Sequence, residues 1–171
     1  SSYTDFWSVY HQSLGKDAYI KLNSQDAAST SSNIWNNTAP TDSLFYVRSD
    51  SIANENNIDY VAYLWHDVPG VQKFGKYVGN GSADGPFVEL GFRPAVLIWK
   101  KSSASGGNWN VEDSARSPIN PVILTSRLNT NEADLGTSQG NIVELLSNGF
   151  KVRNTSDQTN SSGVSYIYMA W

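Results

Sequence analysis

Short runs of alternating apolar and polar residues follow one another along most of the chain. In residues 59–65, an extended backbone would place Tyr60, Ala62 and Leu64 on one face and the residues between them on the other. This two-residue period predicts β-strands. The other expected strands are residues 7–10, 18–22, 44–48, 74–78, 87–90, 95–100, 108–112, 122–125, 142–146, 150–153 and 165–171.

Turn-forming residues separate these runs, and helical patterns are scarce. Ser147-Asn148-Gly149 lies between two apolar runs and predicts a hairpin. The continuous apolar run in residues 95–99 predicts a strand buried on both faces. Residues 25–30 and 131–135 could each form one helical turn, and no segment keeps a 3.6-residue period. Many short strands with frequent turns predict an all-β sandwich or barrel.

The chain contains an internal repeat, in which residues 6–65 are echoed by residues 108–171. Repeats at this spacing indicate tandem units rather than a solenoid, whose units are about 20–50 residues long. Four blocks recur in the same order at offsets of 102, 106, 105 and 106 residues: 6–10 with 108–112, 22–27 with 128–133, 45–48 with 150–153, and 59–65 with 165–171.

The two units differ in completeness. Residues 73–101 precede the second Trp-Val block, whereas only Ser1–Asp5 precede the first. We therefore expect residues 1–67, the first repeat, to be the rear part of a diverged unit, and residues 68–171, the second repeat, to be more complete. The missing initial methionine favours a fragment or a processed chain. About 65 residues with half a core bury too little apolar surface to be stable alone. We therefore expect the first repeat to pack with the second as one unit, or to complete its sheet through another chain.

Tryptophan positions follow the repeat. Trp7 is equivalent to Trp109, and Trp65 is equivalent to Trp171. A large aromatic residue that recurs at equivalent positions is expected to anchor a core. Trp35 has no aromatic counterpart and lies among polar residues, so it is the candidate ligand-binding residue, as a platform for carbohydrate. Loop packing and an intersubunit contact are the alternatives for Trp35.

Composition narrows the class of protein. Charged residues make up 16% of the chain and the net charge is −4, which argues against a nucleic-acid partner. Abundant Ser, Thr, Asn and Gly are typical of many-stranded extracellular or virion proteins. The sequence has no apolar run of about 18 residues, so no transmembrane helix is predicted. It also has no leader in which basic residues precede an apolar stretch. The absence of cysteine excludes disulfides and cysteine-bound zinc.

Catalytic chemistry is difficult to assemble from these residues. His11 and His66 each follow an expected strand, and the second repeat has Asp113 in the place of His11, so we expect surface or edge histidines. Glu112 and Asp113 are adjacent in a strand and point to opposite faces, so they cannot act together on one glycosidic bond. No Gly-x-Ser-x-Gly motif occurs. We therefore expect no catalytic residues and no enzymatic activity.

Two equivalent loops carry oxygen ligands of the kind that calcium prefers. Asp50 and Asn54 lie in the first loop, and Asp157 and Asn160 lie in the second. These four residues are the candidate calcium ligands, and no other cofactor is expected. Their spacing matches no EF-hand, and Asn/Asp-rich segments commonly form turns, which is the alternative interpretation.

The second repeat resembles a known domain. The resemblance is carried by residues 73–95, Trp109-Asn110-Val111, Asn129-Thr130, Ser147-Asn148-Gly149-Phe150 and residues 166–170. They resemble an uncharacterised β-rich domain, often tandem, of tail-fibre-like and other virion structural proteins of marine bacteriophages and of marine metagenomic sequences. The resemblance implies an antiparallel β-sandwich of jelly-roll or concanavalin A-like lectin type, built from two related halves. It supplies no catalytic or ligand-binding residues.

These observations lead to an expectation about function. We expect a non-enzymatic structural or adhesive module of a phage tail fibre or surface appendage, which contacts the host envelope through many weak sites acting by avidity. The alternatives are a carbohydrate-binding module of a larger secreted protein and a spacer or oligomerisation domain. Expected partners are further copies of the chain, other virion proteins or a host-surface glycan, without nucleic acid or membrane insertion. The expected location is the virion surface or the extracellular space.

Overall fold

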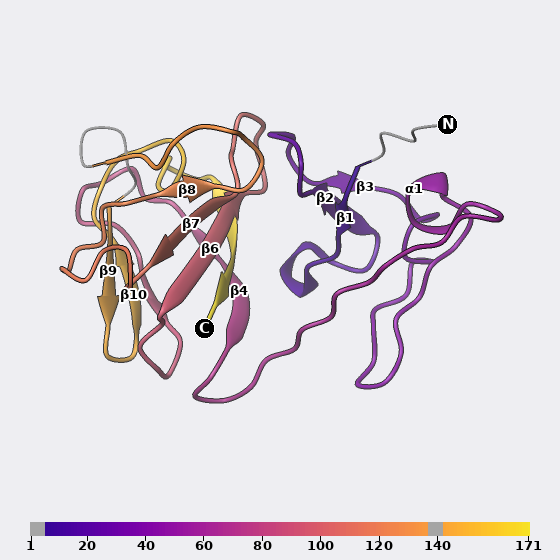
Figure 1. Cartoon of the computed structure of the whole chain (residues 1–171), viewed down its shortest axis with the longest axis horizontal. Coiled ribbons are helices and arrows are strands. Elements are labelled where there is room, and N and C mark those ends of the chain that lie inside the picture. Colours follow the sequence, from indigo (N-terminus) through magenta and orange to yellow (C-terminus); the bar gives the residue numbers. More distant parts are fainter. Residues whose placement is uncertain (1–5, 137–141) are drawn as a thin grey trace.

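The computed structural model describes residues 6–136 and 142–171 and consists mainly of antiparallel β-strands (Figure 1). Within those residues the helical elements are η1 (Gln12–Leu14) and α1 (Ser51–Asn54), so the expectation of an all-β chain is confirmed. The helical turns expected at residues 25–30 and 131–135 are wrong. A hydroxyl just before each segment bonds the backbone instead: Ser24 accepts a hydrogen bond from the Asp26 amide at 2.9 Å, and Thr130 accepts one from the Glu132 amide at 3.5 Å.

A five-stranded sheet forms the middle layer of the molecule. Its strands lie in the order β4 (Lys73–Val78), β11 (Ser165–Ala170), β6 (Val96–Lys101), β7 (Asn110–Asp113) and β8 (Ser126–Arg127). All neighbours are antiparallel. β11 is hydrogen-bonded along both edges, to β4 on one side and to β6 on the other, so the last strand of the chain is an interior strand of the sheet.

A three-stranded sheet packs on one face of the middle layer and completes a β-sandwich. Its order is β5 (Phe87–Glu89), β10 (Gly149–Val152) and β9 (Val143–Leu146). The predicted hairpin joins β9 to β10. Gly149 is required there, because a Cβ atom at this position would lie 2.1 Å from the Val88 carbonyl oxygen. The buried side chains between the two sheets include Tyr77, Val88, Leu97, Trp99, Val143, Leu145, Phe150, Val152, Tyr166 and Tyr168.

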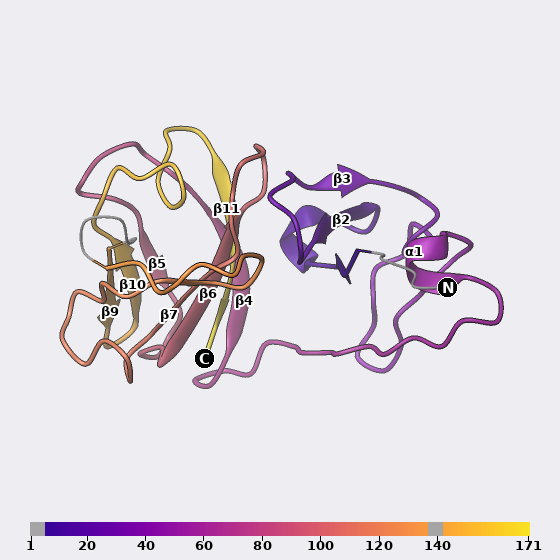
Figure 2. The same cartoon turned by 45° about the horizontal axis from the view of Figure 1, so that its top comes forward.

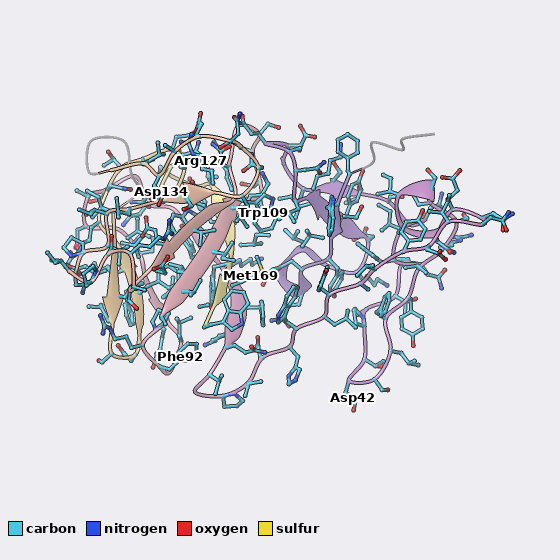
Figure 3. All side chains as sticks on the ribbon, in the orientation of Figure 1. Asp42, Phe92, Trp109, Arg127, Asp134 and Met169 are labelled. Atoms are coloured by element: carbon cyan, nitrogen blue, oxygen red, sulfur yellow. The ribbon has the colours of Figure 1, made fainter. Side chains whose placement is uncertain are left out.

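A third sheet lies against the outer face of the middle layer (Figures 1 and 2). It contains β1 (Ser8–Val9), β2 (Ala18–Lys21) and β3 (Ser29–Thr30). Figure 3 shows Trp109 and Met169 on the side of the middle layer that faces this sheet. The buried contact contains Ile20, Trp109 and Ile167, with Val9, Leu14, Leu22, Ala28, Ile98 and Met169 packed around them. β11 therefore has both faces covered, as the alternation of its side chains requires.

Hydrogen bonds hold the third sheet to the middle layer. The Trp109 indole N–H donates to the Lys21 carbonyl at 2.8 Å. The Lys100 ammonium donates to the Ser24 carbonyl at 2.9 Å. His11 is buried and its Nε2 lies 3.2 Å from the Tyr168 carbonyl. The first repeat thus docks on the second through residues 8–30, by an apolar contact and by polar contacts around it.

The rest of the first repeat has little regular structure. Residues 31–58 lie beyond the third sheet, and the chain then returns in an extended connection to β4 (Figures 1 and 2). The strands expected at residues 44–48 and 59–65 are wrong, and residues 122–125 form only isolated bridges. A strand needs hydrogen-bonded neighbours, and among the described residues 59–65 have none.

The repeated tryptophans are not all core residues. Trp109 is fully buried, whereas Trp7 is 56% exposed and Trp65 is 59% exposed. Trp171 is half-buried and meets the Phe74 ring edge-on at 5.7 Å. The core role is therefore right for Trp109 and wrong for Trp7 and Trp65. The third sheet covers Trp109, and no described residues provide such a cover for the other two.

Truncation of Trp109 tests the contact between the first repeat and the middle layer. Trp109→Ala should lower the free energy of unfolding by about 3–5 kcal/mol, because it removes a fully buried aromatic side chain and its hydrogen bond to Lys21. Urea denaturation followed by circular dichroism measures the loss. Trp7→Ala, the equivalent change at an exposed position, should alter stability by only about 0.5 kcal/mol. Equal losses in the two variants would contradict the observed difference in burial.

Candidate functional site

Trp35 is engaged in packing within the first repeat. Its side chain is half-buried, and its indole N–H donates to the Ala18 carbonyl at 3.0 Å. The Tyr10 ring meets it edge-on at 6.1 Å. A platform for sugar stacking presents a free aromatic face to solvent. The contacts of Trp35 instead tie the Ile34 loop to β2.

The calcium candidates of the first repeat shape one turn. The Asp50 carboxylate accepts a hydrogen bond from the Ile52 amide at 3.2 Å, as the N-cap of α1. The Asn54 side chain donates to the Arg48 carbonyl at 2.7 Å. The structure therefore brings Asp50 and Asn54 into the same turn, in which both serve the backbone.

The calcium candidates of the second repeat also hold loops together. Asp157 is ion-paired with Lys101 at 2.5 Å, and hydrogen bonds from Lys101 and then Ser161 lower the pKa of its carboxyl group. Asn160 is fully buried and donates to Asn80, Ser82 and Asn154 at 2.7–3.0 Å. In residues 6–136 and 142–171, no three His, Cys, Asp or Glu side chains gather as a metal site.

The two histidines lie in different environments. His66 is exposed, as expected. The expectation of a surface or edge position is wrong for His11, which is 4% exposed because it caps η1 at the contact between the two repeats. Its Nδ1 accepts a hydrogen bond from the Ser13 amide, so its Nε2 carries the proton and donates to the Tyr168 carbonyl. Burial lowers the pKa of this imidazole, which favours the neutral form.

A charged cluster lies beside β8, at the upper part of the sandwich in Figure 3. Arg116 bonds Asp113 at 2.5 Å and Asp134 at 2.6 Å, and it also bonds Ser126. Arg127 pairs with Glu132 at 2.5 Å. A cavity of about 490 Å³ borders Arg127, Glu132 and Asp134. Each arginine is already paired with carboxylates, so the cavity offers no uncompensated cation to an anionic ligand.

Glu112 is a buried carboxyl group that the sequence pattern did not single out as a core residue. It points to the sandwich interior, opposite to Asp113, as the strand alternation predicted. Its Oε1 accepts a hydrogen bond from the Thr125 hydroxyl at 2.8 Å, and its Oε2 has no hydrogen-bond partner. Burial raises the pKa of Glu112 well above its usual value. Burial therefore favours the neutral form of this enclosed group, which suits a structural role.

The same contacts recur at equivalent positions of the two repeats. The Leu22 amide donates to the Trp7 carbonyl at 2.8 Å, and the Leu128 amide donates to the Trp109 carbonyl at 2.9 Å. Further pairs follow at an offset of 106 residues: Tyr19–Ser29 with Thr125–Leu135, Asn54–Arg48 with Asn160–Asn154, Glu55–Tyr60 with Ser161–Tyr166, and Tyr60–Ser51 with Tyr166–Asp157. In the second pair the carbonyl of Arg48 takes the place of that of Asn154, one residue beyond its sequence equivalent Arg153.

Burial, by contrast, differs sharply between equivalent side chains. Tyr60 is 45% exposed where its equivalent Tyr166 is fully buried, and Val61 is 74% exposed where Ile167 is fully buried. We name this surface of the first repeat the open face. It comprises Phe45, Val47, Tyr60, Val61, Tyr63, Leu64 and Trp65, each exposed by more than a third.

The open face is the candidate functional site, and the sequence signal for it was present but incomplete. The repeat showed that residues 73–101 have no counterpart ahead of the first repeat. It did not show that the apolar residues of the first repeat stay in solvent, because the expected strands appeared able to pack on the second repeat. Large apolar side chains that are exposed together in this way are typical of an interaction site.

The sequence of the chain was compared with known protein families, curated proteins and solved structures. Residues 1–171 match the family described as a domain of unknown function, DUF7483. The chain belongs to this family. No curated protein and no solved structure matches the chain. Within the described residues of this DUF7483 chain, no helix is long and apolar enough to cross a membrane.

Asn160 offers a test of the loop interpretation in the DUF7483 chain. Asn160→Ala should lower the free energy of unfolding by about 2 kcal/mol, because it removes a fully buried side chain that donates to Asn80, Ser82 and Asn154. Asn54→Ala, the matched control, removes one hydrogen bond at an exposed position and should cost at most about 1 kcal/mol. Urea denaturation measures both. Thermal unfolding midpoints should be the same in calcium chloride and in a chelator, and a clear rise with calcium would support the metal alternative.

Glu112 predicts a pH dependence of stability. In the unfolded chain a glutamate carboxyl group has a pKa of about 4.3. In the folded chain burial raises the pKa of Glu112, so its carboxyl group keeps its proton to higher pH. Unfolding then releases a proton, so the free energy of unfolding should fall, by up to about 1.4 kcal/mol per pH unit, as the pH rises from about 4.3 towards the folded pKa.

Glu112→Gln lacks this titration, so its stability relative to the natural chain should increase as the pH rises above about 4.3. Glu89→Gln, which removes an exposed carboxyl group, is the matched control. Urea denaturation at a series of pH values measures the difference. A constant difference for Glu112→Gln would mean that Glu112 ionises normally in the folded chain.

Proposed function

We propose that this chain is a non-enzymatic structural module of an extended, repeat-built assembly, such as a phage tail fibre or surface appendage at the virion surface. The observation that carries the proposal is the pair of repeats with matching internal contacts and unequal burial. One repeat docks on the next through an extensive apolar contact, and the other end of the pair presents further apolar surface. Modules joined in this way build length.

The roles of the chemically capable residues support a structural function. His11 and Lys100 bond carbonyl groups at the contact between the repeats. Burial lowers the pKa of Lys100 to about 8, and its ammonium also donates to the Gly107 carbonyl. His11 and Lys100 thus hold backbone segments of the two repeats together, as a structural module requires.

The resemblance to virion proteins supplies the location in this proposal. The uncharged polar composition and the expected partners, which are further units and other virion proteins, are consistent with it. Contact with a host-surface glycan is the second candidate, in an adhesive or carbohydrate-binding module. It receives less support, because the contacts of Trp35 tie that side chain to β2 and to Tyr10.

Mass spectrometry of purified phage particles tests the location. Peptides of this chain should be enriched in intact particles relative to the soluble fraction of infected cells. Detection only in the soluble fraction would contradict a virion role. A glycan array tests the second candidate: binding that is lost in Trp35→Ala and kept in Trp7→Ala would replace the structural proposal by a lectin function.

A further inference from the structure

The open face has the features of an incomplete β-sandwich. Residues 59–65 correspond to β11 at an offset of 106 residues, and 44–47 correspond to β10 at an offset of 105. In the second repeat, β11 and β10 lie in opposite sheets of one core. Their first-repeat equivalents keep the apolar side chains of such a core and expose them to solvent.

The second repeat shows what covers these side chains. Tyr166 and Phe150 pack with Tyr77 of β4, at ring-centroid distances of 5.1 and 5.8 Å. Leu97 and Trp99 of β6 belong to the same core. The equivalents of Tyr166 and Phe150 are Tyr60 and Phe45, which are 45% and 43% exposed. What these two rings lack is a segment with strands like β4, β5 and β6.

The backbone points to the same missing segment. Every residue from Ser165 to Ala170 pairs with β4, and residues 166–170 also pair with β6. Residues 59–65, by comparison, form no backbone hydrogen bond within the described part of the chain. Unpaired, extended and apolar backbone is a template for strand addition.

Polar contacts of the second repeat also have incomplete counterparts in the first repeat. Asn160 and Asn54 make equivalent bonds to Asn154 and Arg48. Asn160 also bonds Asn80 and Ser82 in the loop that follows β4. Asn54 is exposed and its turn is already shaped like that of Asn160, so it is preorganised for a loop of the same kind.

We propose that the open face is an acceptor site for a segment equivalent to residues 73–101, donated by a further unit of this repeat on the N-terminal side in the same polypeptide. The donor would add a β4-like and a β6-like strand on the two edges of residues 59–65 and a β5-like strand beside residues 44–47. Element order decides the source, because in the second repeat β6 leads directly into β7, and β7 is the equivalent of β1.

A second copy of the present chain is a poor donor. Its β4 and β6 already pair with its own β11 along the whole strand. They could be released only by opening the sandwich. A further unit whose rear half lies in this chain has no β11-like strand of its own other than residues 59–65, so its donor strands are available.

The opposite side of residues 59–65, which corresponds to the side of β11 that faces the third sheet, indicates how units stack on one another. Val61 and Tyr63 are the equivalents of Ile167 and Met169, and Trp7 is the equivalent of Trp109. In the second repeat, this outer side is covered by the third sheet of the unit before it. Trp7, Val61 and Tyr63 are 56%, 74% and 64% exposed. A preceding unit would cover them in the same way, which gives a head-to-tail array that grows by repetition.

A chimera tests the proposal. Residues 68–102, the donor segment, are placed before residue 1 of the full chain. Trp7 and Trp109 are 102 residues apart, so this junction gives the donor the spacing to Trp7 that β6 has to Trp109. Amide hydrogen exchange of residues 59–65 should slow by at least about a hundredfold relative to the natural chain. Tryptophan emission should shift to shorter wavelength as Trp65 becomes half-buried, like its equivalent Trp171.

The matched control carries Leu97→Asp and Trp99→Asp in the donor segment only. It has the same length and should give no protection of residues 59–65. Exchange of β11 in the same samples reports whether the sandwich is intact. If the chimera loses that protection, a synthetic peptide of residues 68–102 added to the natural chain gives the same readout.

Three outcomes overturn the proposal. The first is that residues 59–65 remain unprotected both in the chimera and with the peptide. The second is that the control protects them as much as the chimera does. The third is that the natural chain is a dimer in which they are already protected. Protection of residues 59–65 in the chimera, without protection in the control, establishes the acceptor site. This result depends on strand pairing only, so it is independent of whether the chain is found in phage particles.

Discussion

The structure depends on covering both edges and both faces of β11. Backbone pairing to β4 and β6 satisfies its edges, the sandwich core buries Tyr166 and Tyr168, and the third sheet buries Ile167. Each covering element supplies what the others cannot, because hydrogen bonds lie in the plane of a sheet and side chains stand perpendicular to it. The order of layers follows from this one strand.

The first repeat shows the consequence of losing those covers. Residues 59–65 have the same alternation as β11 and the same local anchor, in which a tyrosine hydroxyl bonds the preceding turn. They lack strands on either side, and their apolar residues face solvent. The local conformation of the turn is kept because its hydrogen bonds are short-range. The sheet is not formed because the described residues offer residues 59–65 no free strands equivalent to β4 and β6.

The polar residues with candidate chemistry are used to join these layers. Asn160 and Asp157 were recognised from the sequence as oxygen donors, and the structure shows them binding loops and Lys101. His11, Lys100 and Glu112 are buried at positions that short-range patterns could not reveal. Their burial comes from strands and turns that lie more than 70 residues away for His11 and Lys100, and from packing against the opposite sheet for Glu112.

The sequence by itself determined the strand-rich class, the hairpin at residues 147–149, the alternation in β11 and the correspondence between the two repeats. These features depend on neighbouring residues and on side-chain period. Only the tertiary structure decided that Trp109 is buried while Trp7 is not, and that residues 44–48 and 59–65 form no strand. Equivalent sequences differ there because burial and strand pairing are properties of the partner as well as of the segment.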